Sequence, residues 1–527
     1  MMDKADGPSL RSGFLASAAA DPDGAALVVR GVRLSYGELE TTSRRWAAAI
    51  TGRLGRPAQR VGVYAYRSAV SYAGTLAAMM SGAAFVPLNP TFPAEKTASM
   101  IAQADLDAII VDKLCSEQLA NTLPAGLSPL LLTPELDNPQ FPGVAAPILD
   151  RAALDNTAPL AALPPIITED VAYLLFTSGS TGLPKGVPVT HGNARHFVDV
   201  MRERYAITRD DRFSQTFDQT FDLSVFDLFL AWHSGACVYS MATVDLLAPA
   251  GFINKNGITI WFSVPSVPAQ MRKRKRLTPN LMPGLRWSLF CGEPLPRASA
   301  AEWQAAAPNS VVENLYGPTE LTIACLVYRW DDATSPALCR HDVVPIGRPL
   351  PGLGAMLIDE ELRPVAEGAE GELCVSGPQT TPGYWKDPQR TAERFVTLPV
   401  SPVESRRFYR TGDRVGRLDC GEYVFLGRTD HQIKVLGHRV ELGEVEAALR
   451  ADPRVTEAIG IGWPVEQGSA QGIVAFVSGA ELDVENLLRL ARQALPPWAV
   501  PQRIVIKDEM PLNANGKIDR RALAATL

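Results

Sequence analysis

Short apolar segments alternate with amphipathic segments along the first part of the chain. The pattern predicts strands at residues 60–66, 84–87 and 108–111, and helices at residues 69–82 and 94–103. Strands that are apolar throughout are typical of a parallel sheet that helices cover on both faces. The regular alternation therefore predicts an α/β fold built from βαβ units.

The pattern changes further along the chain. Residues 123–165 are rich in Pro and Leu and predict an irregular surface connection. Residues 371–426 contain short apolar runs separated by Gly and Asp turns, such as Leu418-Asp-Cys-Gly-Glu422, which predict antiparallel hairpins. Beyond them the pattern predicts a helix, two strands and a second helix, at residues 439–450, 457–462, 472–477 and 484–495.

These segments predict two domains, because a chain of 527 residues is too long for one compact core. We expect a large N-terminal domain, residues 1–429, of mixed and parallel sheets flanked by helices, with a small β-rich subregion. A small, mobile C-terminal α+β domain, residues 430–527, is expected to follow it.

The composition is that of an ordinary globular enzyme, with 46% hydrophobic and 20% charged residues. A net charge of −6 gives no electrostatic reason to bind nucleic acid or an anionic membrane. Residues 1–12 lack the apolar core of a signal peptide, and no apolar run is long enough to cross a bilayer, so we expect a cytoplasmic protein. The cysteines and histidines show no metal-binding spacing, which favours free thiols and no structural metal.

One loop has the composition of a phosphate-binding site. An apolar strand, Tyr173 to Thr177, leads directly into Ser178-Gly-Ser-Thr-Gly-Leu-Pro-Lys-Gly186. Its glycines allow backbone N–H groups to approach phosphate oxygens closely, and Lys185 adds a positive charge. It is not a Walker A loop, because Gly186 stands where that motif needs Ser or Thr. A flexible hydroxyl-rich turn explains the glycines, but not the lysine or the strand before it.

Further motifs follow this loop in order along the chain. They are Asn314-Leu-Tyr-Gly-Pro-Thr-Glu320, Tyr409-Arg-Thr-Gly-Asp413, Gly427-Arg-Thr-Asp430 with Gln432-Ile-Lys434, Gly437-His-Arg-Val-Glu-Leu-Gly-Glu444 and Pro511-Leu-Asn-Ala-Asn-Gly-Lys517. Together with the loop they resemble the adenylate-forming superfamily, which includes acyl-CoA synthetases, firefly luciferase and the adenylation domains of nonribosomal peptide synthetases. The resemblance extends over nearly the whole chain.

The resemblance implies that ATP and Mg²⁺ are cofactors, and that a carboxylate attacks the α-phosphorus and expels pyrophosphate. Positive charge and positioning must offset the repulsion between these anions. The implied catalytic residues are Lys185, Thr319, Glu320 and Lys517, with Glu320 also binding Mg²⁺. The implied nucleotide-binding residues are Thr177, Ser178, Gly179, Ser180, Thr181, Gly182, Lys185, Asn314, Tyr316, Gly317, Thr319, Asp413 and Arg428.

By the same resemblance, Tyr316 lies against the adenine, and Asp413, helped by Arg428, accepts both ribose hydroxyls. Lys517 reaches from the small domain to the substrate carboxylate. The small domain rotates about Asp430, which makes this residue a hinge. Each assignment has a plainer alternative: a Gly-Pro turn at Tyr316, a hairpin turn at Asp413, a solvent-exposed side chain at Lys517 and an ordinary junction at Asp430.

Asp222 distinguishes amino acids from other carboxylic acids. It lies in Phe221-Asp-Leu-Ser-Val-Phe-Asp-Leu-Phe229 and matches the aspartate with which amino-acid adenylation domains pair the substrate α-ammonium. A buried carboxylate is costly unless it is paired, and an ammonium substrate supplies the partner. The alternative is that Asp222 caps the helix that begins at Leu223.

Comparison between the motifs predicts a side-chain pocket next to Asp222. Its lining is uncharged and its leucines make it shallow, so we expect a small neutral amino acid: alanine, serine, cysteine, proline or valine. The predicted substrate-binding residues are Asp222, Leu223, Phe226, Ser266, Leu289, Cys291, Leu315, Ile323 and Ala324.

The resemblance therefore predicts a freestanding ligase of the nonribosomal-peptide-synthetase type, acting in natural-product biosynthesis. It would form an aminoacyl-AMP and pass the amino acid to the phosphopantetheine thiol of a separate carrier protein. The sequence shows no GGxS-type carrier site after Lys517 and no HHxxxDG condensation motif, which favours the freestanding form. Three alternatives stay open: an acyl-CoA ligase, which Asp222 disfavours; a D-alanine–carrier protein ligase of the same fold; and a catalytically silent paralogue, which the intact Lys185, Glu320, Asp413 and Lys517 disfavour.

Overall fold

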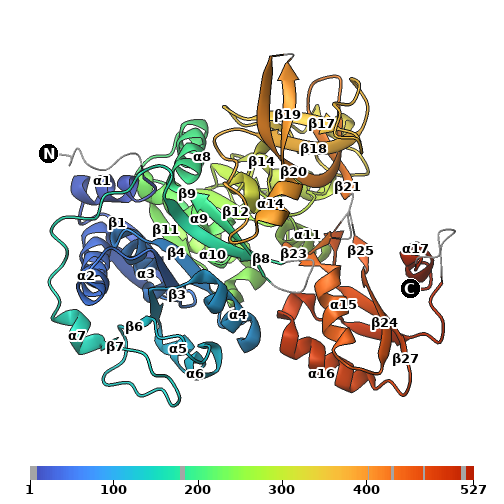
Figure 1. Cartoon of the computed structure of the whole chain (residues 1–527). Coiled ribbons are helices and arrows are strands. Elements are labelled where there is room, and N and C mark those ends of the chain that lie inside the picture. Colours follow the sequence, from blue (N-terminus) through green and yellow to red (C-terminus); the bar gives the residue numbers. More distant parts are fainter. Residues whose placement is uncertain (1–8, 179–183, 402, 429–431, 467–468, 512–517) are drawn as a thin grey trace.

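The computed structural model describes residues 9–178, 184–401, 403–428, 432–466, 469–511 and 518–527. Two large sheets form its body (Figure 1). The seven-stranded sheet has the order β7-β6-β5-β3-β4-β8-β9. Neighbouring strands in it are parallel, except that β9 runs antiparallel to β8. Its strands are β3 (Arg60–Tyr64), β4 (Ala84–Leu88), β5 (Ala108–Val111), β6 (Leu130–Thr133), β7 (Ile148–Asp150), β8 (Val171–Thr177) and β9 (Lys185–Thr190).

The nine-stranded sheet has the order β16-β15-β14-β13-β12-β10-β11-β1-β2. Its central strands are parallel, and β2, β15 and β16 run antiparallel to their neighbours. Its strands are β1 (Ala25–Val29), β2 (Val32–Ser35), β10 (Arg212–Gln215), β11 (Cys237–Ser240), β12 (Ile260–Ser263), β13 (Trp287–Phe290), β14 (Val311–Tyr316), β15 (Leu326–Arg329) and β16 (Arg348–Pro349).

Helices cover both sheets, and their ends follow local chemistry. Helix α2 begins with a capping box, in which the Ser35 hydroxyl accepts the N–H of Glu38 and the Glu38 carboxylate accepts the N–H of Ser35; it ends at Gly55 in the left-handed conformation. The helices are α1 (Ser12–Ala20), α2 (Tyr36–Leu54), α3 (Ala69–Met80), α4 (Ala94–Ala104), α5 (Lys113–Ser116), α6 (Leu119–Thr122), α7 (Arg151–Asp155), α8 (His191–Tyr205), α9 (Leu223–His233), η1 (Thr243–Leu247), α10 (Pro249–Asn256), α11 (Ser266–Lys273), α12 (Arg297–Ala306), η2 (Thr319–Leu321) and α13 (Ser335–Leu338).

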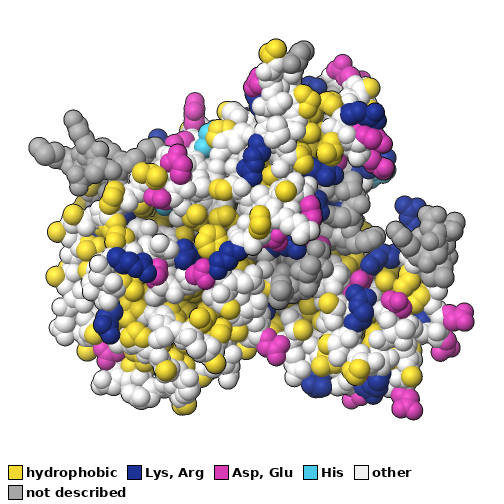
Figure 2. Space-filling model, in the orientation of Figure 1, with side chains coloured by type: hydrophobic (Ala, Val, Ile, Leu, Met, Phe, Trp, Pro, Cys, Tyr) yellow, Lys and Arg dark blue, Asp and Glu magenta, His cyan; other side chains and the backbone are white. Residues whose placement is uncertain are grey.

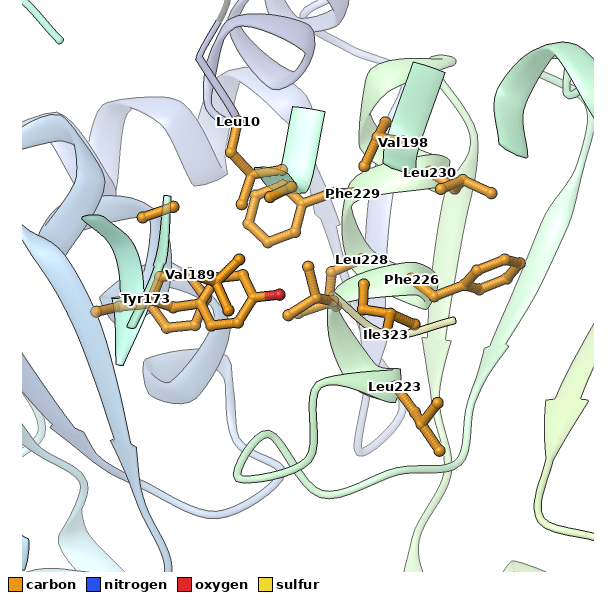
Figure 3. Packing of buried hydrophobic residues seen from close by; sticks show 14 of the residues in the cluster. Leu10, Tyr173, Val189, Val198, Leu223, Phe226, Leu228, Phe229, Leu230 and Ile323 are labelled. Atoms are coloured by element: carbon orange, nitrogen blue, oxygen red, sulfur yellow. The ribbon is translucent and has the colours of Figure 1, made fainter. Parts of the chain in front are cut away.

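Helix α9 lies between the two large sheets and is buried from Leu223 to Trp232. A helix that is apolar on nearly all sides is stable only inside a core. Figure 3 shows its side chains between Tyr173 and Val189, which come from β8 and β9, and the strands of the nine-stranded sheet. This packing fixes the position of Asp222, the residue that directly precedes the helix.

A third, antiparallel sheet stands at one end of the body (Figure 1). The predicted turn at 418–422 is present, with the N–H of Leu418 donating to the carbonyl of Glu422. Its elements are β17 (Gly354–Ile358), β18 (Gly371–Ser376), α14 (Pro388–Arg394), β19 (Phe395–Ser401), β20 (Glu404–Arg417) and β21 (Tyr423–Arg428).

The described residues from 432 to 527, which we call the C-terminal region, form two small sheets with helices packed on them. They have a hydrophobic cluster of their own, which includes Val445, Ala475 and Leu487. Its elements are β22 (Gln432–Val435), β23 (His438–Glu441), α15 (Leu442–Arg450), β24 (Val455–Gly462), β25 (Val465–Glu466), β26 (Ser469–Ala470), β27 (Ile473–Gly479), α16 (Val484–Ala494), η3 (Pro497–Ala499), β28 (Arg503–Ile506) and α17 (Arg520–Ala524).

The predicted α/β class is confirmed, and two element predictions were wrong. Residues 123–165 contribute β6 and β7, which extend the seven-stranded sheet by pairing with β5. The helix predicted at 439–450 begins at Leu442, because residues 438–441 form β23 and pair with β22. In both places pairing with a distant or adjacent strand overrides the local pattern.

On the face drawn in Figure 2, basic and acidic side chains are interspersed. All seven cysteines are free thiols. Of the described helices, none is long and apolar enough to cross a membrane.

Candidate active site

Residues from motifs far apart in the sequence line one cavity. It lies where β8, β13 and β14 end, and the carboxyl ends of strands are the usual position of ligand sites in such sheets. β23 of the C-terminal region closes another side of it. The predicted site residues that line it are Thr177, Ser178, Asp222, Leu223, Cys291, Tyr316, Gly317, Thr319, Asp413 and Arg428.

Asp413 is held between a tyrosine and an arginine. The register of β20 and β21 pairs Asp413 with Arg428, whose Nη1 donates to Asp413 Oδ1 at 2.8 Å. The Tyr316 hydroxyl donates to Asp413 Oδ2. Burial raises the pKa of Tyr316 well above its ordinary value, and the Asp413 charge adds to this shift, so the tyrosine is a neutral donor. The sheet thus presents an oriented carboxylate at the edge of the cavity.

A second cavity of about 320 Å³ adjoins the first and shares Tyr316, Gly317 and Asp413 with it. Asn314 lines this second cavity, and its buried Oδ1 atom has no hydrogen-bond partner among the described residues. Gly317 permits the tight turn after β14, because an added Cβ would lie 2.5 Å from the Cα of Ala324. The cavity therefore offers an aromatic face, a buried amide oxygen and a carboxylate.

Glu320 lies between two cations, Lys185 and Arg439. Its carboxylate is fully buried, 3.2 Å from Lys185 Nζ and 3.2 Å from Arg439 Nη1, and it accepts a hydrogen bond from the Tyr384 hydroxyl. Burial alone would raise the pKa of Glu320, but Arg439 and Lys185 outweigh it and hold the pKa well below its usual range. Burial, assisted by Arg439, lowers the pKa of Lys185 to about 8. Glu320 is therefore ionised, and the charges of Arg439 and Lys185 stabilise its negative charge.

The surroundings of Glu320 fit an Mg²⁺ ion that has few protein ligands. The described residues contain no group of three or more His, Cys, Asp or Glu side chains that would form an all-protein cage. A single carboxylate beside a lysine suits Mg²⁺, which keeps water and takes its other ligands from substrate phosphates. Glu320 would hold the ion, and the ion would neutralise phosphate charge.

Asp222 is a buried carboxylate with one oxygen, Oδ2, that has no hydrogen-bond partner among the described residues. It is 7% exposed, and its Oδ2 atom accepts no hydrogen bond from the described residues. It precedes α9 but its side chain does not cap the helix, so the helix-cap alternative does not hold in this structure. Burial raises the pKa of Asp222 to about 6. A cation placed in the cavity next to Asp222 would remove this penalty.

The residues predicted to line the side-chain pocket fall into three groups. Asp222, Leu223 and Cys291 line the first cavity. Ser266 does not line it: it begins α11 and borders separate cavities, whereas Val264 lies against Gly292 at the site. The remaining residues, Phe226, Leu289, Leu315, Ile323 and Ala324, are buried in the cluster behind Asp222, and Leu315 also borders the second cavity.

No individual role was predicted from the sequence for several residues that line the cavity. Arg439 pairs with Glu320, and its backbone carbonyl accepts a hydrogen bond from Ser178 Oγ at 2.9 Å. The His438 ring stacks on Trp498 at 3.7 Å, and both line the cavity with Lys434. The motifs at 432–434 and 437–444 were the available signal, but only the fold shows which side chains face the site. Gly179, Ser180, Thr181, Gly182, Asp430 and Lys517 lie outside the described residues.

Comparison with known proteins gives matches over almost the whole chain. Residues 14–385 match the AMP-binding enzyme family, and residues 444–517 match the AMP-binding enzyme C-terminal domain. The chain is 38% identical to CymA of Salinispora arenicola, described as a nonribosomal peptide synthetase, over 97% of this chain but 6% of that protein. It is 35% identical to the L-proline–[L-prolyl-carrier protein] ligase of Streptomyces coelicolor, over 93% of this chain and 91% of that enzyme.

A solved structure matches at the level of the whole fold. The Vibrio cholerae adenylation domain AlmE, in complex with glycyl-adenosine-5'-phosphate, has a TM-score of 0.86 and 31% identity. The match covers 100% of this chain and 99% of that one.

Proposed function

The chain belongs to the AMP-binding enzyme family, and we propose that it activates a small neutral amino acid as its aminoacyl-AMP and then transfers it to a thiol. The acceptor we propose is the phosphopantetheine arm of a separate carrier protein. ATP and Mg²⁺ are the cofactors.

The observation that carries the amino-acid assignment is the Oδ2 atom of Asp222, a buried carboxylate oxygen at the cavity that has no hydrogen-bond partner among the described residues. An α-ammonium group bound in the cavity would pair with Asp222 Oδ2 and regain the cost of burying that charge. A carboxylic acid without an amino group would leave Asp222 unpaired. The acyl-CoA ligase alternative is disfavoured for this reason.

The nucleotide would span the two cavities. The adenine would lie against Tyr316 in the second cavity, and Asp413, oriented by Arg428, would accept the ribose hydroxyls. Lys185 would contact the phosphates and Glu320 would hold Mg²⁺, which supplies positive charge to the phosphates. These assignments rest on the geometry of the described side chains and on their agreement with the motifs.

A small substrate side chain is supported by the packing behind Asp222. Phe226, Leu289, Ile323 and Ala324 are at most 1% exposed, and the first cavity is lined by Leu223 and Cys291 but by none of these four. The related enzyme from S. coelicolor is named for proline, and AlmE was solved with a glycyl adenylate. We propose alanine, serine, cysteine, proline or valine as the range.

Two arrangements of the C-terminal region would serve the two steps. In the described arrangement, β23 faces the cavity, and Ile518, next to Lys517 in sequence, packs in a separate cluster with Phe476. We assign this arrangement to thiol transfer. A rotation about Asp430 would bring Lys517 to the site for adenylation. In transfer, the thiol sulfur bonds to the carbonyl carbon, the bond from this carbon to the phosphate oxygen breaks, AMP leaves and the thiol proton passes to solvent.

Amino-acid-dependent exchange of pyrophosphate into ATP tests the first step, and loading of a holo carrier protein tests the second. Asp222→Asn should lose exchange at least a hundredfold, because it removes the charge that pairs with the α-ammonium. Asp227→Asn is a matched control on the same helix, because Asp227 is also a buried carboxylate but does not line the cavity. Efficient transfer to coenzyme A, with none to a holo carrier, would instead assign the chain to the acyl-CoA ligases.

A further inference from the structure

Glu293 joins the two parts of the molecule through both of its carboxylate oxygens. It follows β13, is 6% exposed, and its Oε2 accepts the N–H of Ser266 at 2.8 Å in the body of the molecule. Its Oε1 accepts the N–H of Gly437 at 2.5 Å and the hydroxyl of Ser469 at 3.1 Å. Both donors to Oε1 belong to the C-terminal region.

Gly437 lies so close to Val264 in the body of the molecule that a larger residue would not fit. Gly437 has φ of +85°, and a Cβ at this position would lie 2.5 Å from Val264 Cγ1. It belongs to the turn between β22 and β23, and Arg439 follows two residues later. Fixing the Gly437 N–H therefore also fixes the strand that carries Arg439 to Glu320.

We propose that Glu293 is a positioning residue that holds the β22–β23 turn over the active site during thiol transfer. This inference rests on the proposed function, whose second step requires that arrangement. Oε1 has hydrogen-bond donors only from the C-terminal region among the described residues. If that region turns away, Oε1 loses the hydrogen bonds from Gly437 and Ser469, which only the docked arrangement provides. Glu293 thus favours the docked state without touching the reacting atoms.

The test separates docking from adenylation. The variants are Glu293→Ala, Glu293→Gln, Ser469→Ala and the double variant Glu293→Ala with Ser469→Ala. Pyrophosphate exchange measures adenylation. Single-turnover transfer of the aminoacyl group from the preformed adenylate to pantetheine measures the second step, and hydrogen–deuterium exchange of residues 432–441 measures docking.

Glu293→Ala should slow transfer by about tenfold and exchange by less than about threefold, because the hydrogen bonds that it removes exist only in the docked state. Glu293→Gln should fall between it and the wild type, since its amide oxygen still accepts a hydrogen bond. Ser469→Ala should slow transfer less, and should add nothing in the Glu293→Ala background. The 432–441 segment should exchange faster in Glu293→Ala. Ser478→Ala, at another buried serine of the same region, should change none of these readouts.

Equal slowing of both steps by Glu293→Ala, additive effects of the two changes, or unchanged deuterium uptake would overturn the proposal. If Glu293→Ala does not fold, Ser469→Ala tests the same contact without altering the body of the molecule. A wild-type protein that exchanges pyrophosphate with no amino acid would defeat the proposed function instead. In that case deuterium uptake at 432–441 still decides whether Glu293 docks the turn.

Discussion

Arg439 Nη1 of β23 lies 3.2 Å from the buried carboxylate of Glu320, the residue that we assign to Mg²⁺. A cation from the C-terminal region therefore stands beside the carboxylate that would hold the metal during adenylation. A positive charge at this point during transfer would stabilise Glu320 and the AMP phosphate that remains after pyrophosphate has left.

The first prediction concerns Arg439. Arg439→Gln should slow transfer to a thiol about tenfold or more, while pyrophosphate exchange falls much less, because the ion pair forms in the arrangement with β23 at the site. Single-turnover transfer and exchange assays measure the two steps. Arg363→Gln is the control, since that arginine is 68% exposed in a surface ion pair and should alter neither step. A greater loss of exchange than of transfer would contradict the assignment.

The ionised form of Asp222 should destabilise the folded, ligand-free protein. Its pKa is raised by burial from 3.8 to about 6. Well below pH 3.8 Asp222 is protonated in both the folded and the unfolded chain and no cost arises; as pH rises to about 6 the unfolded chain ionises first, and above that the full cost of about 3 kcal/mol applies. Asp222→Asn should therefore raise the melting temperature much more at pH 7.5 than at pH 4. A lower melting temperature at pH 7.5 would show that Asp222 is already paired.

The same ionisation predicts a pH dependence of amino-acid activation. The substrate ammonium pairs only with ionised Asp222, and kcat/KM reports the ionisation of the free enzyme. We therefore expect kcat/KM for the amino acid to fall below about pH 6, by about tenfold per pH unit. Steady-state exchange assays from pH 5 to 9 measure this. A flat profile down to pH 5 would argue against a role for the Asp222 charge.

Gly437 should be sensitive to a single methyl group. Gly437→Ala places a Cβ 2.5 Å from Val264 Cγ1, so the turn must shift away from the body of the molecule. Transfer should fall by at least tenfold, and exchange should be largely kept. Gly368→Ala is a matched control, because Gly368 has φ of +81° but open space around it, so it shares the backbone strain without the clash. Similar effects of the two substitutions would attribute the loss to strain alone.

Part of this molecule was predictable from local sequence. β5 (Ala108–Val111) is a short apolar strand that follows the amphipathic helix α4, and its predicted boundaries agree with the structure. Strand β23 was read as helix, because Val440 is its only fully buried residue and its strand character comes from pairing with β22. Sheet pairing is a tertiary interaction that a local pattern does not specify.

The site was predictable where motif and chemistry coincide, and not where contacts join distant segments. Asp413 and Arg428 lie in quoted motifs, and the register of β20 and β21 brings them together. The contact of Glu293 with Gly437 joins residues 144 positions apart, and no local pattern encodes it. Ser266 begins α11 and borders separate cavities, and its role in substrate binding stays a prediction.

The measurement that tests the central claim most directly is pyrophosphate exchange with a panel of L- and D-amino acids and propionate. We expect strong exchange with one or a few small neutral amino acids and at least a hundredfold less with propionate, which lacks the ammonium that pairs with Asp222. The D-isomers identify or exclude a D-alanine ligase. Exchange with propionate equal to that with alanine, or no exchange with any amino acid, would contradict the account.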